Sequence, residues 1–115
     1  MSERPKYRVL VAEDDPFQRL SLIDILTLSN FKPTSVENGK QALEVLSDPK
    51  NQFDLVLLDL IMPEKTGKDV LEEMMSDERL KTIPVIVMSA QDDKDIIGEC
   101  LATGARDYIV KPLRV

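Results

Sequence analysis

The sequence contains no histidine and no tryptophan, and it has a single cysteine, Cys100. The absence of histidine excludes imidazole as a general base, a metal ligand or a phosphorylated group within this chain. A lone cysteine cannot form an internal disulfide, and a free thiol suits a reducing compartment, so we expect a cytoplasmic protein. Only three phenylalanines and two tyrosines are present, which leaves few rings to stack on nucleic-acid bases.

Long apolar runs are also absent. The runs at residues 55–58 and 85–88 fall far short of the roughly 20 apolar residues that a membrane-spanning helix needs, and no apolar signal segment follows the N-terminus. Acidic residues outnumber basic ones, 21 to 15, and the net charge of −6 disfavours contact with phosphate backbones. With 115 residues the chain has room for one core, so we expect one domain that contacts neither membrane nor nucleic acid.

Five short runs rich in aliphatic or β-branched residues predict β-strands, at 7–12, 34–36, 55–58, 85–88 and 108–110. Their nearly continuous apolar character indicates strands that are covered on both faces. Segments with helical periodicity lie between the strands and carry four groups of residues expected to face inward. These are Leu22, Ile25 and Leu26; Ala42, Leu43 and Leu46; Val70, Leu71 and Met74; and Ile97, Cys100 and Leu101.

Each helical segment begins with a capping signal. The pairs are Asp15 with Gln18, Asn38 with Gln41, Thr66 with Asp69 and Asp92 with Asp95, and Gly104 suits the end of the fourth helix.

Strands alternating with helices predict an α/β fold with an open, doubly wound parallel sheet. The fifth strand needs a covering helix, yet the sequence stops at Val115, so we expect a single domain, residues 1–115, truncated after this strand.

Polar side chains follow four of the predicted strands: Glu13 and Asp14 the first, Asp59 the third, Ser89 the fourth and Lys111 the fifth. In open parallel sheets the carboxyl ends of the strands meet at one edge, where ligands bind. Three carboxylates brought together there repel one another by about 1 kcal/mol or more per pair, so they need a cation. With no histidine and no nearby cysteine, an all-oxygen site for Mg²⁺ satisfies this need.

These residues also have plainer interpretations. Asp59 alone could cap the loop after its strand, and Ser89 could be a turn cap. Glu13 to Asp15 could form a solvated helix cap, and Lys111 could simply pair with the acids. The coincidence of the acidic pair with Asp59 favours the metal site.

Several segments together resemble the receiver domain of two-component response regulators. They are Glu13-Asp14-Asp15-Pro16, the strand 55–59 with Leu60-Ile61-Met62-Pro63 and Gly67 after it, Val87-Met88-Ser89-Ala90, and residues 104–112. The resemblance covers about residues 7–113, nearly the whole chain. It implies a flavodoxin-like sheet of five strands in the order 2-1-3-4-5. It also implies a phosphorelay switch whose catalysis acts only on itself, rather than an enzyme with an external substrate.

The resemblance assigns the acidic residues to phosphoryl transfer. Asp59 would accept a phosphoryl group from a phosphohistidine of a sensor histidine kinase or a histidine phosphotransfer protein. The cofactor would be Mg²⁺, held by the side chains of Asp14 and Asp59 and by the backbone carbonyl of Ile61, and Glu13 would act through a bound water.

The resemblance also implies how the switch works. Lys111 would pair with the phosphoryl oxygens, Ser89 would move to hydrogen-bond the phosphoryl group, and Tyr108 would change rotamer to fill the vacated space. A downstream effector module would read the altered surface. The family's fifth helix is absent here, and we expect a partner, a dimer or a swapped segment to cover the apolar face that it leaves.

The isoleucine at position 61 bears on the lifetime of the acyl phosphate and on a rival enzymatic function. Isoleucine cannot orient an attacking water by hydrogen bonding, so we expect slow hydrolysis of the acyl phosphate. A Mg²⁺-dependent phosphatase or phosphotransferase with Asp59 as nucleophile needs a second acid two residues later, where Ile61 stands. A second rival is a pseudo-receiver, a protein-binding module that works without phosphorylation, and the presence of Asp59, Lys111 and the acidic pair argues against it.

Overall fold

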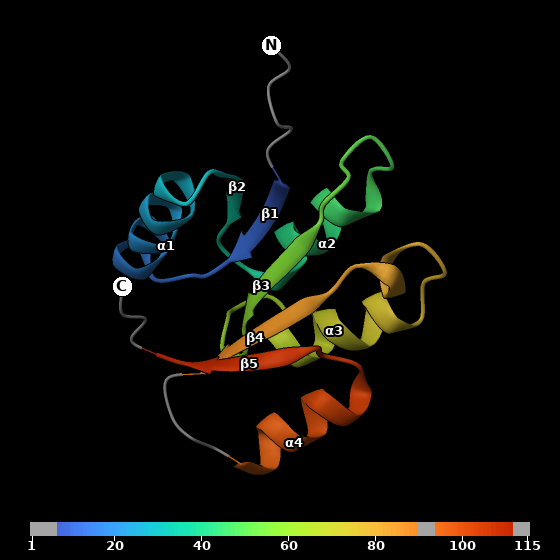
Figure 1. The fold of residues 1–115 in the computed structure, drawn as a ribbon. Helices are drawn as coiled ribbons and strands as arrows, with labels where there is room; N and C mark the ends of the chain where they lie inside the picture. Colours follow the sequence, from blue (N-terminus) through green and yellow to red (C-terminus); the bar gives the residue numbers. More distant parts are fainter. Residues whose placement is uncertain (1–6, 90–93, 112–115) are drawn as a thin grey trace.

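The computed structural model describes residues 7–89 and 94–111, whose strands form a five-stranded parallel sheet in the order β2-β1-β3-β4-β5 (Figure 1). The strands are β1 (Tyr7–Ala12), β2 (Phe31–Val36), β3 (Leu55–Asp59), β4 (Val85–Ser89) and β5 (Asp107–Val110). The helices are α1 (Pro16–Leu28), α2 (Gly39–Ser47), α3 (Gly67–Met75), the short 3₁₀ helix η1 (Leu80–Thr82) and α4 (Lys94–Thr103). The predicted doubly wound α/β fold and its strand order are confirmed.

The helices begin where the capping signals predict. The Asp15 carboxylate accepts hydrogen bonds from the backbone N–H groups of the first turn of α1, and the Asn38 side chain accepts one from Gln41. Thr66 and Asp69 form a reciprocal capping box at the start of α3, which satisfies two N–H groups that would otherwise lack partners. The predicted cap Asp92 lies outside the described residues.

Alternation along the strands divides the core into two layers. Leu10, Val56, Leu58 and Val87 pack with residues of α2, α3 and α4. Their neighbours Val9, Val11, Leu57 and Met88 pack with Leu22 and Leu26 of α1. Because successive side chains of a strand point to opposite faces, the sheet is apolar on both sides, as the continuous runs predict.

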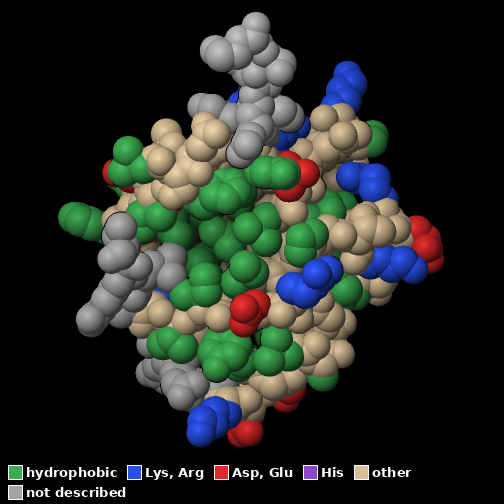
Figure 2. All heavy atoms as spheres, in the orientation of Figure 1, with side chains coloured by type: hydrophobic (Ala, Val, Ile, Leu, Met, Phe, Trp, Pro, Cys, Tyr) green, Lys and Arg blue, Asp and Glu red, His purple; other side chains and the backbone are tan. Residues whose placement is uncertain are grey.

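The face of the sheet next to α1 is covered less completely than the other. Figure 2 shows apolar side chains gathered over the strands on this side of the molecule. Leu55, Ile86 and Ile109 pack against this layer but are only partly buried. Among the described residues of this face, Val9 and Val11 of the inner strand β1 are therefore fully buried, whereas Leu55, Ile86 and Ile109 are not.

Two predictions of local structure are wrong. Strand β2 begins at Phe31 rather than residue 34, because Phe31 to Pro33 pair in register with Tyr7 to Val9 of β1, and an edge strand tolerates the proline. Leu101 does not face the core, since 39% of its surface is exposed. Helix α4 lies beside the edge strand β5 and buries only a narrow stripe, made by Ile97 and Cys100.

Of the other predicted core residues, Ile25 and Leu43 are half-buried and the rest are buried. Cys100 is fully buried, and burial raises the pKa of its thiol, as expected for a core residue rather than a reactive one. Gly104 follows α4 with φ of 143°, a backbone conformation that favours glycine. No helix in residues 7–89 and 94–111 is long and apolar enough to cross a membrane.

Candidate functional site

The sheet order brings the carboxyl ends of β1, β3, β4 and β5 to one edge. Parallel pairing aligns Ala12 of β1 with Leu58 of β3, so Glu13 and Asp59 follow at neighbouring positions. Ser89 at the end of β4 pairs with Val110, the residue before Lys111. The predicted convergence of these strand ends is therefore observed.

Three carboxylates meet at this edge. One oxygen from each of Glu13, Asp14 and Asp59 lies within 4.8 Å of the others. Glu13 is fully buried and Asp59 is nearly so, whereas Asp14 is exposed. Burial raises the pKa of Glu13, and the neighbouring Asp59 carboxylate raises it further. Burial of these negative charges without a cation is therefore energetically unfavourable.

Lys111 is the cation that the chain itself supplies. Its Nζ lies 2.8 Å from Oε1 of Glu13 and 3.1 Å from Oδ2 of Asp59, and its side chain is only 9% exposed. Burial by itself lowers the pKa of the Lys111 ammonium, but the hydrogen bond to Glu13 and the charge of Asp59 outweigh it and raise the pKa. Lys111 therefore stays charged and bridges the two buried acids.

The backbone fixes both acidic side chains. The N–H of Ile61 donates to Oδ1 of Asp59 at 3.3 Å, and the N–H of Asp15 donates to Oε2 of Glu13 at 3.3 Å. Each buried carboxylate thus has one oxygen on a backbone amide and the other on Lys111. Such contacts hold the carboxylate planes in place before any ligand arrives.

The donor set fits a hard divalent cation. Within the part of the chain that the structure describes, it consists of carboxylate oxygens without a histidine or cysteine ligand, which is the chemistry that Mg²⁺ prefers. The exposed Asp14 leaves one side open to solvent, where a cation could retain water. The remaining acids, Glu13 and Asp59, are held in place by Lys111 and by backbone amides.

The other predicted residues belong to the ends of β4 and β5 and to the loop after β3. Ser89 is buried at the end of β4, and its carbonyl accepts a hydrogen bond of 2.7 Å from the N–H of Lys111. Tyr108 lies on β5 and is 41% exposed. Ile61 has its backbone at Asp59 but its side chain 75% exposed. The structure thus brings together Glu13, Asp14, Asp59 and Lys111, with Ser89 adjoining them.

Arg19, the fourth residue of α1, was not predicted to belong to the site. Its guanidinium donates to the backbone carbonyls of Glu13 at 2.9 Å and Asp14 at 3.4 Å, and its side chain is largely buried. The contact holds the acidic segment against the start of the helix. An arginine among the otherwise uncharged residues 16–23 was the available signal, but nothing local indicated its target.

Comparison with known proteins identifies the family to which the chain belongs. The family described as response regulator receiver domain matches residues 9–115. The two-component response regulator ORR3 of rice, Oryza sativa, is 38% identical over 110 residues, which cover 96% of this chain and 83% of the rice protein.

Two solved structures are also similar. The phosphorylated cyanobacterial phytochrome response regulator RcpA has a TM-score of 0.88 and 28% identity, over 96% of this chain and 84% of that one. The receiver domain of the sensor histidine kinase PA1611 from Pseudomonas aeruginosa, with magnesium coordinated in its active-site cleft, has a TM-score of 0.83 and 26% identity, over 96% and 88%. The chain therefore belongs to the receiver domain family of two-component response regulators, a family of signalling domains.

Proposed function

We propose that Asp59 accepts a phosphoryl group from a phosphohistidine of a sensor histidine kinase or a histidine phosphotransfer protein. The observation that carries the proposal is the setting of Asp59, which is buried beside Lys111 at 3.1 Å and within 4.8 Å of two further acids. The phosphorylated state of the similar protein RcpA supports it. The domain would act as a switch rather than as an enzyme with an external substrate.

The cation of this reaction would be Mg²⁺. Asp14 and Asp59 would hold it with their carboxylates, Ile61 with its backbone carbonyl, and Glu13 through a water. The acidic cluster supports this assignment, as does the magnesium ion in the PA1611 receiver domain. A bound Mg²⁺ would neutralise charge on the phosphoryl oxygens during transfer.

The transfer itself is a substitution at phosphorus. A carboxylate oxygen of Asp59 forms the new O–P bond while the N–P bond to the donor imidazole breaks, and the leaving nitrogen keeps the electron pair and takes up a proton. The Ile61 amide orients the carboxylate for this attack. Lys111, already on Asp59, would follow the new phosphoryl oxygens and balance part of their charge of about −1.5 to −2.

Phosphorylation would change the conformation of the strands next to the site. Ser89 would hydrogen-bond the phosphoryl group, and the Tyr108 ring would move toward the space that this opens. Tyr108 and Val110 of β5 and Leu101 of α4 are exposed, so movement there changes a surface that a downstream effector module can contact. Phosphorylation would shift the balance between two such arrangements.

Incubation with phosphoramidate and Mg²⁺ tests the proposal. We expect the intact chain to gain the mass of one phosphoryl group, and we expect Asp59→Asn and chelation of Mg²⁺ each to abolish the gain. The matched control is Asp24→Asn, at an exposed aspartate of α1, which should be phosphorylated like the native chain.

The same experiment separates the rival functions. No mass gain by the native chain would support a protein-binding module that works without phosphorylation. Rapid turnover of a phosphate ester would indicate a phosphatase. A gain that persists in Asp59→Asn would refute Asp59 as the acceptor.

Replacing Ile61 with asparagine should shorten the lifetime of the acyl phosphate. The Ile61 side chain is exposed next to the acceptor and offers no hydrogen bond, whereas asparagine could orient an attacking water. We expect hydrolysis to be about tenfold faster, less than the roughly 10²–10⁴-fold of a general base, because asparagine would orient the water without taking its proton. Loss of the phosphoryl group, followed by mass spectrometry after removal of the donor, measures it. Ile61→Val should keep the native lifetime, and an unchanged lifetime in Ile61→Asn would contradict the prediction.

A further inference from the structure

The loop that links Asp59 to α3 is held in an unusual backbone conformation. Two consecutive residues that are not glycine, Glu64 and Lys65, have positive φ angles of 69° and 152°. Residues with side chains seldom adopt such angles, and two in succession persist where the surrounding structure stabilises them. The loop is closed by a hydrogen bond of 3.1 Å from the N–H of Gly67 to the carbonyl of Leu60. Its shape is therefore determined by contacts rather than by its own preferences.

One of these contacts comes from α2, far away in the sequence. Gly39, the first residue of α2, is buried against Lys65, and a Cβ added to it would lie 2.2 Å from the Lys65 carbonyl oxygen and 2.8 Å from its Cβ. The obstructing oxygen belongs to the backbone, so it cannot give way by a change of rotamer. Any side chain at position 39 must displace the loop or the start of the helix.

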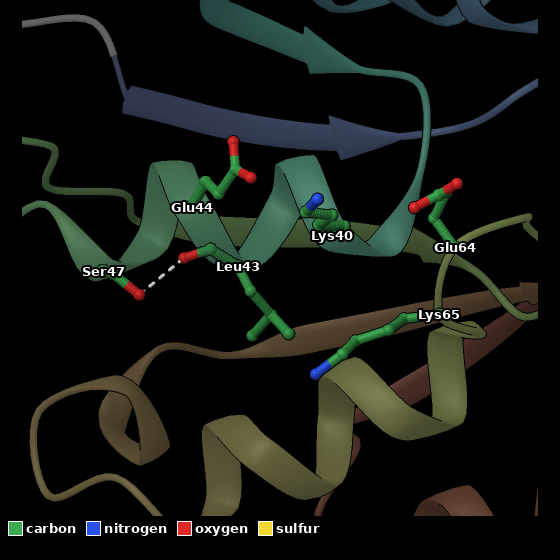
Figure 3. Close-up of a pocket in the computed structure, with 6 residues that line it drawn as sticks. All are labelled: Lys40, Leu43, Glu44, Ser47, Glu64 and Lys65. Atoms are coloured by element: carbon green, nitrogen blue, oxygen red, sulfur yellow. Dashed lines mark hydrogen bonds between the residues drawn. The ribbon is translucent and has the colours of Figure 1, made fainter.

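Beyond Gly39 the helix and the loop separate. A groove of about 570 Å³ lies between them, lined by Lys40, Leu43, Glu44 and Ser47 of α2 and by Glu64 and Lys65 of the loop (Figure 3). The Lys65 ammonium crosses toward α3, where it pairs with Glu73 at 2.9 Å. Gly39 thus marks a point of close backbone contact between α2 and the loop, next to this groove.

We propose that Gly39 is a positioning residue of the phosphoacceptor site, an inference that rests on the proposed function. The loop that it supports carries Ile61, whose amide holds Oδ1 of Asp59. The hydrogen bond from Gly67 fixes the loop at Leu60. A displacement of the Lys65 backbone must therefore be taken up by the few residues between them, which include Ile61. Gly39 would therefore set the orientation of the Asp59 carboxylate and of the Ile61 carbonyl without touching either.

The variant Gly39→Ala tests this role, with Gly98→Ala as the matched control. A Cβ at Gly98 in α4 meets no atom within 4 Å, so the control makes the same chemical change in open space. Phosphorylation by phosphoramidate is measured well below the unfolding temperatures of both variants. We expect Gly39→Ala to react about tenfold more slowly or worse, since displacement of about 1 Å can reduce rates a hundredfold. Gly98→Ala should react at the native rate.

Two readouts separate positioning from a purely structural role. The amide resonances of Ile61 and Gly67 should shift in Gly39→Ala and not in Gly98→Ala, and calorimetric titration with Mg²⁺ should show weaker binding in Gly39→Ala alone. Adding Lys65→Gly should restore part of the rate, because glycine removes the Cβ that lies 2.8 Å away and lets the backbone that carries the obstructing oxygen move more easily.

Native rate, native Mg²⁺ affinity and unmoved Ile61 resonances in folded Gly39→Ala would overturn the inference, even if its unfolding temperature falls. The spectra and the Mg²⁺ titration remain decisive if the native chain takes up no phosphoryl group. That result would refute the proposed function, while weakened Mg²⁺ binding with displaced Ile61 resonances would still support the positioning role.

Discussion

Replacing Lys111 with methionine should lower the free energy of unfolding by about 3–5 kcal/mol at neutral pH without divalent cations, the usual loss when one partner of a buried ion pair is removed. The substitution leaves the buried carboxylates of Glu13 and Asp59 without the ammonium that lies 2.8 Å and 3.1 Å away. Methionine has a similar length, so the loss reports the charge rather than a cavity. Urea denaturation followed by circular dichroism measures it.

The loss of unfolding free energy in Lys111→Met should depend on pH. Burial, and next the Asp59 carboxylate, already raise the pKa of Glu13 above its ordinary value of 4.5, while Lys111 opposes them. Without Lys111 the pKa of Glu13 should rise further. A carboxyl group with a raised pKa in the folded state stabilises the fold below its unfolded pKa and loses that contribution as pH rises through the folded pKa. The variant should therefore lose more stability than the native chain as pH is raised from about 4.5 toward neutrality.

Mg²⁺ should offset part of the loss. A cation bound only by the folded state stabilises it in proportion to the logarithm of its concentration above the dissociation constant. Because the Lys111 ammonium repels a cation held by the same acids, Mg²⁺ should stabilise Lys111→Met more than the native chain.

The control is Lys68→Met, at an exposed lysine that pairs with Glu99 at 2.8 Å on the surface of α3 and α4. Exposed pairs contribute little, so this variant should stay near native stability and show no added response to Mg²⁺. Equal losses in the two variants would mean that Lys111 does not neutralise the buried acids.

Local signals account for the parts of the fold that the sequence predicted well. Asp15, Asn38 and Thr66 cap helices through contacts within three residues, so their effect can be read from adjacent letters. Strand β1 matches its prediction because its apolar run is continuous. Strand β2 was predicted too short because Lys32 and Pro33 have little strand preference of their own and join the sheet through pairing with β1.

The candidate site was predictable to the extent that topology alone determines it. Parallel strands bring their carboxyl ends together, so Glu13, Asp14, Asp59 and Lys111 could be placed at one edge before their distances were known. Arg19 was missed because its partners are backbone carbonyls, which have no signature in the sequence.

The close contacts of two glycines that support the loop after β3 were not predicted, although Gly67 was among the residues of the resemblance, and the reason is related. A glycine required for close approach looks the same in sequence as one in a flexible turn. Gly39 meets Lys65, which is 26 positions away, and Gly67 meets the backbone of Asp59 itself. Only the packed structure distinguishes them from Gly98, which faces open space.

Replacing Gly67 with alanine should destabilise the domain by about 3 kcal/mol, the upper end of the usual range for overpacking. Its Cβ would lie 2.2 Å from the carbonyl oxygen of Asp59 and 2.8 Å from the Cα of Leu60, and both are backbone atoms of a buried strand end. Relief therefore requires that α3 or the end of β3 moves. Urea denaturation measures the loss, and phosphorylation by phosphoramidate should fall as well because Asp59, the proposed acceptor, is displaced.

Gly98→Ala should change stability in the opposite direction. Position 98 lies inside α4, is exposed and has no neighbour that a methyl group would meet, so alanine should add about 0.5–1 kcal/mol through its better helix propensity. The same substitution is thus expected to stabilise one helix and to destabilise the other, because of these two glycines Gly67 packs against the end of β3 at Asp59. A Gly67→Ala domain that matches the native chain in both stability and phosphorylation rate would show that the end of β3 yields easily, and that this close contact does not hold Asp59 in place.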